Sequence, residues 1–161
     1  MRFRRVAAAL LPLALTACLE GSDTTTNVSP NIPIEQTTFA AALNVDLAAS
    51  TKTSSGLYIR DITVGTGAAA TGTSAVSVYY EGFLANGGRF DYRLSPSQPY
   101  SFTNGTGGVI AGWEEGIVGM KAGGTRQLII PPSLAYGPYG RPPVIPQNAV
   151  LVFTVQLVSV P

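Results

Sequence analysis

Aromatic side chains are the residues of this sequence whose type and spacing could do chemistry. Six of them come from six separate segments, and Asp91 directly follows one of the six. A fold that brought them together would form a concave, apolar patch able to hold an apolar ring. Any single one could equally be plain core, although a buried tyrosine also needs a hydrogen-bond partner that a ligand could supply. The six aromatic residues are Tyr80, Phe90, Tyr100, Trp113, Tyr136 and Phe153.

The inventory of reactive groups excludes several classes of enzyme. The chain has no histidine and one cysteine, which removes Ser-His-Asp triads, Cys-His pairs, zinc fingers and intrachain disulfides. Its formal net charge is +1, and no basic cluster follows the first five residues, so we expect no nucleic-acid partner. We therefore expect a site that works without a nucleophile, a metal or a cofactor.

The beginning of the chain is typical of an export signal. Three arginines within the first five residues precede an apolar run over 6–17, which is too short to span a bilayer. We interpret residues 1–17 as a signal peptide. The run ends in Leu-Thr-Ala-Cys, which resembles the lipobox of bacterial lipoproteins, where the cysteine is acylated. Cys18 is thus the predicted lipidation site; an ordinary signal with an incidental cysteine is the alternative.

Lipidation would attach the protein to a membrane of the bacterial cell envelope, facing the periplasm. Stable attachment needs more than one acyl chain, which the lipoprotein resemblance implies. Leu19 follows the cysteine in place of the Asp that retains some lipoproteins in the inner membrane, so the outer membrane is favoured.

The segment between this leader and the main domain has two predicted parts. Residues 18–37 are rich in Thr, Asn, Ser and Pro and are expected to form a flexible tether. Residues 38–55 are expected to hold a short helix and a linker, because Phe39, Leu43 and Leu47 recur every four residues. That helix would pack on its own domain, with dimerisation as the alternative.

Residues 56–161 are expected to form one α+β domain. Alternating apolar positions predict strands near 57–64, 76–80 and 150–158, and Asn86-Gly87-Gly88 predicts a hairpin turn. The apolar spacing over 110–119 predicts one short helix.

Several motifs in this region together resemble the FKBP-type peptidyl-prolyl cis-trans isomerases. The resemblance covers 76–157 closely and extends weakly back to Gly56. It implies a curved antiparallel sheet of five or six strands wrapped around one short α-helix. It also implies proline-containing polypeptides as substrates and a macrolide as a further ligand. The motifs are VYYEG at 78–82, GRFD at 88–91, VIAGWEEG at 109–116, GG at 123–124, PPSLAYG at 131–137, IP at 145–146 and LVF at 151–153.

The same resemblance implies a role for each candidate residue. Trp113 would form the floor under a prolyl ring, the Ile110 N–H and the Tyr136 hydroxyl would hold the substrate backbone, and Asp91 would lie beside the twisting amide. An ion pair of Asp91 with Arg89 or Arg93 is the alternative for that carboxylate. The walls would be Tyr80, Phe90, Tyr100, Val109, Val144 and Phe153.

Departures from the family pattern limit what the resemblance implies. Pro96 stands where an arginine often pairs with the aspartate, and Arg141 occupies a flap position often filled by histidine. The functions that remain open are an active isomerase of exported proteins, a binding module or holdase without useful catalysis, and an unrelated β-sandwich.

Overall fold

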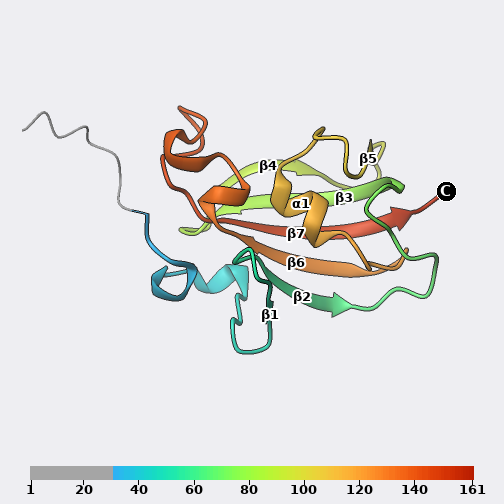
Figure 1. Cartoon of the computed structure of the whole chain (residues 1–161), viewed down its shortest axis with the longest axis horizontal. Helices are drawn as coiled ribbons and strands as arrows, with labels where there is room; N and C mark the ends of the chain where they lie inside the picture. Colours follow the sequence, from blue (N-terminus) through green and yellow to red (C-terminus); the bar gives the residue numbers. More distant parts are fainter. Residues whose placement is uncertain (1–30) are drawn as a thin grey trace, which may run out of the picture.

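One antiparallel sheet runs through most of residues 31–161, which are the residues that the computed structural model describes (Figure 1). Its strands follow the order β1-β2-β6-β7-β3-β4, while β5 pairs with the same edge of β3 that β4 uses. The strands are β1 (Thr51–Lys52), β2 (Tyr58–Thr63), β3 (Ala75–Leu84), β4 (Arg89–Arg93), β5 (Tyr100–Thr103), β6 (Thr125–Ile130) and β7 (Leu151–Ser159).

The single α-helix within residues 31–161, α1 (Ala111–Gly116), lies across one face of this sheet, which we call the front face (Figure 1). Side chains alternate between the two faces along a strand. In β6 and β7, Leu128 and Phe153 therefore join the core under α1, while Ile129 and Val152 point to the opposite, back face. The sheet thus separates two apolar clusters.

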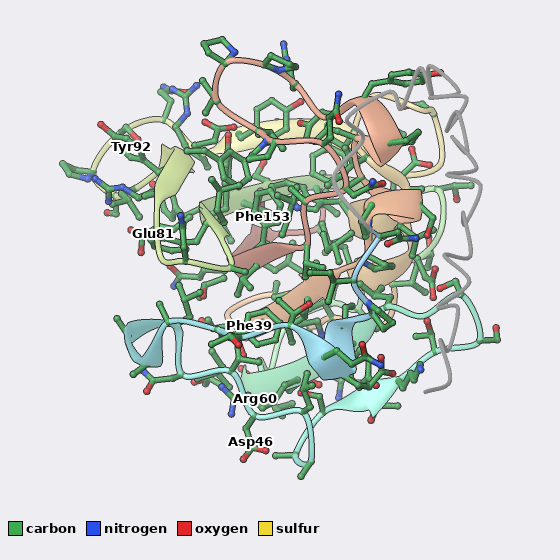
Figure 2. All side chains as sticks on the ribbon, turned by 90° about the vertical axis from the view of Figure 1, so that its left-hand side faces the viewer. Phe39, Asp46, Arg60, Glu81, Tyr92 and Phe153 are labelled. Atoms are coloured by element: carbon green, nitrogen blue, oxygen red, sulfur yellow. The ribbon has the colours of Figure 1, made fainter. Side chains whose placement is uncertain are left out.

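The back face is covered at one end by residues 34–47, which we call the N-terminal strap. The strap contains two 3-10 turns, η1 (Ile34–Gln36) and η2 (Ala41–Leu43), and buries Ile34 and Leu43 against the sheet. Figure 2 shows its Phe39 on the same side of the molecule as Arg60 of β2. The strap therefore belongs to the folded domain.

Glu35 fastens the strap to the sheet. Its carboxylate accepts a 2.6 Å hydrogen bond from the Tyr58 hydroxyl and forms an ion pair with Lys52 of β1. The hydrogen bond from Lys52, and then that from Tyr58, lower the pKa of Glu35 to about 2. Above about pH 2 the Glu35 carboxylate is therefore ionised and can hold Lys52 and Tyr58.

The predicted helix between residues 38 and 49 is wrong. Ala40 is extended and donates its N–H to Ala85 of the β3–β4 hairpin, and Asn44 ends the single turn η2 in the left-handed region. The four-residue spacing of Phe39, Leu43 and Leu47 instead reflects contacts of an irregular strap with the apolar back face.

The predicted tether also ends earlier than expected. Ile34, which was assigned to it, is buried at 4% exposure, so the folded part begins before residue 38. Cys18, the signal peptide and residues 18–30 lie outside the described residues. Within 31–161, no helix has the length and apolar character needed to cross a bilayer.

The predicted α+β architecture is confirmed, with differences of detail. Seven strands are described in place of five or six, because the supposed linker contributes β1 and because two short strands, β4 and β5, share one edge of β3. The hairpin at Asn86-Gly87-Gly88 is present, with Gly87 at a φ of 89°. The helix is shorter than the predicted 110–119, since Ile110 is its N-cap and the chain turns after Gly116.

Candidate functional site

A cavity of about 270 Å³ opens on the front face beside α1. Strands β3, β4, β5 and β7 contribute to it, together with α1 and the loops before α1 and before β7. Eight of the ten residues that the sequence suggested line this cavity: Tyr80, Asp91, Tyr100, Val109, Ile110, Trp113, Tyr136 and Phe153.

Trp113 is at the centre of the aromatic cluster. Its ring meets Tyr80 edge-on at a centroid distance of 4.9 Å and Phe153 edge-on at 5.3 Å. Such perpendicular contacts suit the quadrupoles of aromatic rings. Trp113 is almost wholly buried, and its indole nitrogen has no hydrogen-bond partner among the described residues. The indole is therefore both core and part of the cavity wall.

Two glycines let α1 bring Trp113 this close to the sheet. A Cβ on Gly112 would lie 2.5 Å from Ile130, and one on Gly116 would lie 2.6 Å from Leu128. Both distances are too short for real side chains. The helix can therefore rest directly on β6 only because these two positions lack a Cβ.

Arg126 holds the other end of α1. It is a buried arginine of β6 that donates to the carbonyl oxygens of Gly116 and Val118, at 2.8 and 3.1 Å. It also makes two hydrogen bonds with the carboxylate of Asp61 on β2, at 2.7 and 3.0 Å. A cation at a helix C-terminus is favourable, and the paired geometry fixes its direction. Arg126 thus links α1 to two strands.

Asp91 is hydrogen-bonded to Tyr80 within the cavity. The Tyr80 hydroxyl donates to its carboxylate at 2.9 Å, and the backbone N–H of Tyr92 donates at 2.8 Å. The alternative prediction of an ion pair between Asp91 and Arg89 is wrong, since Arg89 pairs with Glu81. Arg93, the other alternative, takes part in none of the three ion pairs formed within residues 31–161.

Burial, and then the hydrogen bond to Asp91, raise the pKa of the Tyr80 phenol well above its ordinary value. Burial acts in this direction because it disfavours the phenolate, and the anionic acceptor does the same. Tyr80 therefore remains a neutral donor over the whole physiological range.

A second cavity, of about 230 Å³, adjoins the first and contains the two remaining candidates, Phe90 and Val144. Asp91, Tyr136 and Arg141 line both cavities. Phe90 meets Phe153 edge-on at 5.5 Å, and Gly82 leaves the space in which the two rings approach. The two cavities therefore form one groove with a shared rim.

The groove also includes residues that sequence reasoning did not select as site residues. Gly108 lines the first cavity, and Arg141, Pro142 and Ile145 come from the loop before β7. Of these residues, the sequence marks only Arg141, as a departure from the family pattern. A loop of this kind gives no periodic signal, so the direction of its side chains could not be read from the sequence.

Comparison with known proteins points to one family. Residues 66–158 match the model of the FKBP-type peptidyl-prolyl cis-trans isomerases. An FK506-binding protein of Neisseria meningitidis serogroup B is 46% identical over 105 residues, which are 65% of this chain and 96% of the relative. FK506-binding protein 4 of Rhizopus delemar is 52% identical over 109 residues, but these make up 68% of this chain and only 28% of that protein.

Solved structures agree with the sequence matches. The crystal structure of FkpA from Escherichia coli is similar with a TM-score of 0.64 and 41% sequence identity, over 70% of this chain and 51% of FkpA. The crystal structure of AtFKBP13 also has a TM-score of 0.64, with 35% identity, over 70% of this chain and 98% of that one. The family model covers α1 and the strands from β3 onward, and it begins after the strap, β1 and β2.

Proposed function

This chain belongs to the family of FKBP-type peptidyl-prolyl cis-trans isomerases, and from that premise we propose that it speeds rotation about Xaa–Pro bonds in exported polypeptides while anchored in the cell envelope. Residues 66–158 are the part of the chain that matches the family model. The aromatic groove on the front face is the observation that carries the proposal, because its walls and its polar groups suit a prolyl ring and the amide before it.

Rotation about this bond needs little covalent chemistry. Amide resonance sets a barrier of about 18–20 kcal/mol, and uncatalysed exchange takes tens to hundreds of seconds. A reduction of roughly 5–6 kcal/mol would bring it to milliseconds. Aromatic walls that hold the ring against Trp113 disfavour the planar, dipolar amide relative to the twisted one.

Donors at the edge of the cavity hold the substrate during this rotation. The Ile110 N–H lies at the N-cap of α1, and the Tyr136 hydroxyl comes from the loop after β6. In our proposal both donate to substrate carbonyl oxygens, and they favour the transition state because they are already in place. Asp91 acts through its polarity and through Tyr80, whose hydroxyl it orients.

The envelope location is supported by the beginning of the sequence. The basic residues, the apolar run and Leu15-Thr16-Ala17-Cys18 follow the order of a lipoprotein leader. Acyl chains on Cys18 would hold the domain at the periplasmic side of a membrane, with the outer membrane favoured by Leu19. There it would assist the folding of exported proteins.

A macrolide of the FK506 type is proposed as a competing ligand, since the relatives are named for FK506 binding. The macrolide is titrated into the protein, and both Trp113 fluorescence and inhibition of isomerisation are measured. Absence of both responses would contradict it.

The activity itself is tested by exchange NMR on a short peptide with an apolar residue before proline. Residues 31–161 should accelerate cis-trans exchange. Binding without acceleration would indicate a binding module or holdase.

For the anchor, cells are labelled with a palmitate analogue, and wild type should incorporate it while Cys18→Ser should not. Equal labelling of both would remove lipidation at Cys18 from the proposal.

A further inference from the structure

The shared rim of the two cavities contains two charged residues that differ in how they are engaged. Asp91 and Arg141 both line both cavities. The carboxylate of Asp91 already accepts hydrogen bonds from the Tyr80 hydroxyl and the Tyr92 N–H. Arg141 takes part in none of the ion pairs within residues 31–161. Its guanidinium therefore forms no ion pair with a carboxylate of the described domain.

The backbone of Arg141 is fixed although its side chain is exposed. Its N–H donates to the Ile145 carbonyl oxygen at 2.8 Å, and the Ile145 N–H donates back at 3.0 Å. The guanidinium carbon lies over the Tyr136 ring, 6.0 Å from its centroid, within the range of a cation–π contact. The charge is thus held at the junction of the two cavities.

The rest of the second cavity is mainly apolar. Phe90, Pro142, Val144 and Ile145 form its walls around this junction. A side chain that suits such a space has an apolar stem and a terminal anion that can reach Arg141. Glutamate has this form, since two methylene groups precede its carboxylate.

From this arrangement we infer that the groove favours an acidic side chain, glutamate in particular, over a neutral polar one of the same size directly next to the proline. The prolyl ring occupies the first cavity, and the neighbouring side chain enters the second and pairs with Arg141. The inference rests on the proposed isomerase function and adds a substrate class to it. Asp91 opposes an incoming carboxylate, but its own carboxylate already accepts two hydrogen bonds, and Arg93 lies opposite Tyr80 in the β3–β4 pairing, where its positive charge partly offsets that of Asp91.

Matched peptides that differ by one charge test this inference. Glutamate and glutamine are compared directly before and directly after proline, in otherwise identical peptides, and kcat/KM is measured by exchange NMR. An exposed ion pair predicts about a two- to fivefold preference for glutamate at low ionic strength, at one of the two positions. The preference should shrink in 0.5 M salt, because screening weakens exposed pairs.

Variants then assign the preference to Arg141. Arg141→Gln should bring the ratio of glutamate to glutamine close to one, and Arg141→Glu should bring it below one. Lys121→Gln removes the same charge at a residue that lines a different cavity and neither cavity of the groove, and it should keep the wild-type ratio. A ratio of one in wild type at both positions, or an unchanged preference in Arg141→Gln, would overturn the inference.

Binding separates this inference from the proposed function. The same peptides are titrated against Trp113 fluorescence, and the dissociation constants should show the same preference even if no peptide is turned over. Lack of turnover with preferential binding of the glutamate peptides would contradict the isomerase and support the acidic subsite. Turnover with equal affinities and equal rates would support the isomerase and contradict the acidic subsite.

Discussion

Trp113 joins the core of the domain to its cavity. The same ring packs edge-on against Tyr80 and Phe153 and lines the space in which we place the proline. Stability and activity are therefore coupled at this residue, and a test must measure both.

We expect Trp113→Ala to lower kcat/KM by at least about tenfold, equivalent to about 1.4 kcal/mol of transition-state stabilisation. It should also reduce the free energy of unfolding by about 3–5 kcal/mol, because it leaves a large void. Trp113→Phe should lower kcat/KM and the free energy of unfolding by less, since the indole nitrogen has no partner to lose within the described residues. Exchange NMR and urea unfolding measure the two effects. A folded Trp113→Ala with wild-type rates would remove this residue from the site.

Tyr80 makes the pH profile informative. Its raised pKa keeps the phenol protonated, so the hydrogen bond to Asp91 persists between pH 6 and 8. We expect a nearly flat rate over this range and almost no change in heavy water, because no proton is transferred. Asp91→Asn should retain measurable activity. A rate that falls with a midpoint inside this range would show instead that a titrating group takes part directly.

At the scale of elements, the short helix depends on close contact with β6. Gly116→Ala would place a methyl group against Leu128 and push α1 outward. Alanine favours a helix over glycine by about 1 kcal/mol, but overpacking costs about 1–3 kcal/mol. We expect a net loss of stability together with a lower kcat/KM, since Trp113 moves with the helix. Gly72→Ala is the control, because nothing lies within 4 Å of its added Cβ.

The contact between Glu35 and its partners gives the strap a dependence on pH. The folded pKa of Glu35 is about 2, below its ordinary value of 4.5, so its contribution to stability is complete above pH 4.5 and is lost as the pH falls toward 2. Glu35→Gln should therefore be less stable than wild type at pH 6, and the difference should shrink between pH 4.5 and pH 2. Urea unfolding at several pH values measures it. A constant difference would mean that the charge of Glu35 contributes nothing.

The elements that the sequence predicted well are those with a local signal. The Asn86-Gly87-Gly88 turn needs a positive φ that glycine permits, and the strands alternate in a period of two. The strap had no such signal: Phe39, Leu43 and Leu47 fit a helical spacing, but their partners are on distant strands. Likewise, the aromatic residues could be selected from the sequence, whereas the loop that brings Arg141 to the rim could not.

At the scale of the whole molecule, the folded unit is larger than the part that defines the family. The family match begins at residue 66, yet the apolar back face, with Tyr58, Ile129 and Val152, is covered by the strap. A fragment that begins at Gly56 would expose this face. The folded domain therefore begins before Gly56, which is the boundary expected from the sequence.

We expect residues 56–161 to be less stable than residues 31–161, by several kcal/mol, because Ile34 and Leu43 no longer bury the back face. Binding of the dye ANS should rise, as exposed apolar surface binds it. At temperatures where both fragments are folded, kcat/KM should be similar, since the groove is on the opposite face. Equal urea midpoints of the two fragments would show that the strap adds no stability.

The position of β7 sets the order in which this chain can fold. β7 follows every other strand of the sheet in sequence, but it lies between β6 and β3 and pairs with both. A chain that emerges N-terminus first from a ribosome or a membrane channel therefore cannot complete the sheet until residue 159 has passed. Until then no strand joins β2 and β6 to the β3 hairpin by backbone pairing, and both apolar clusters lack the strand that they share. The sheet of such a chain is therefore completed late, after nearly all of its residues have passed.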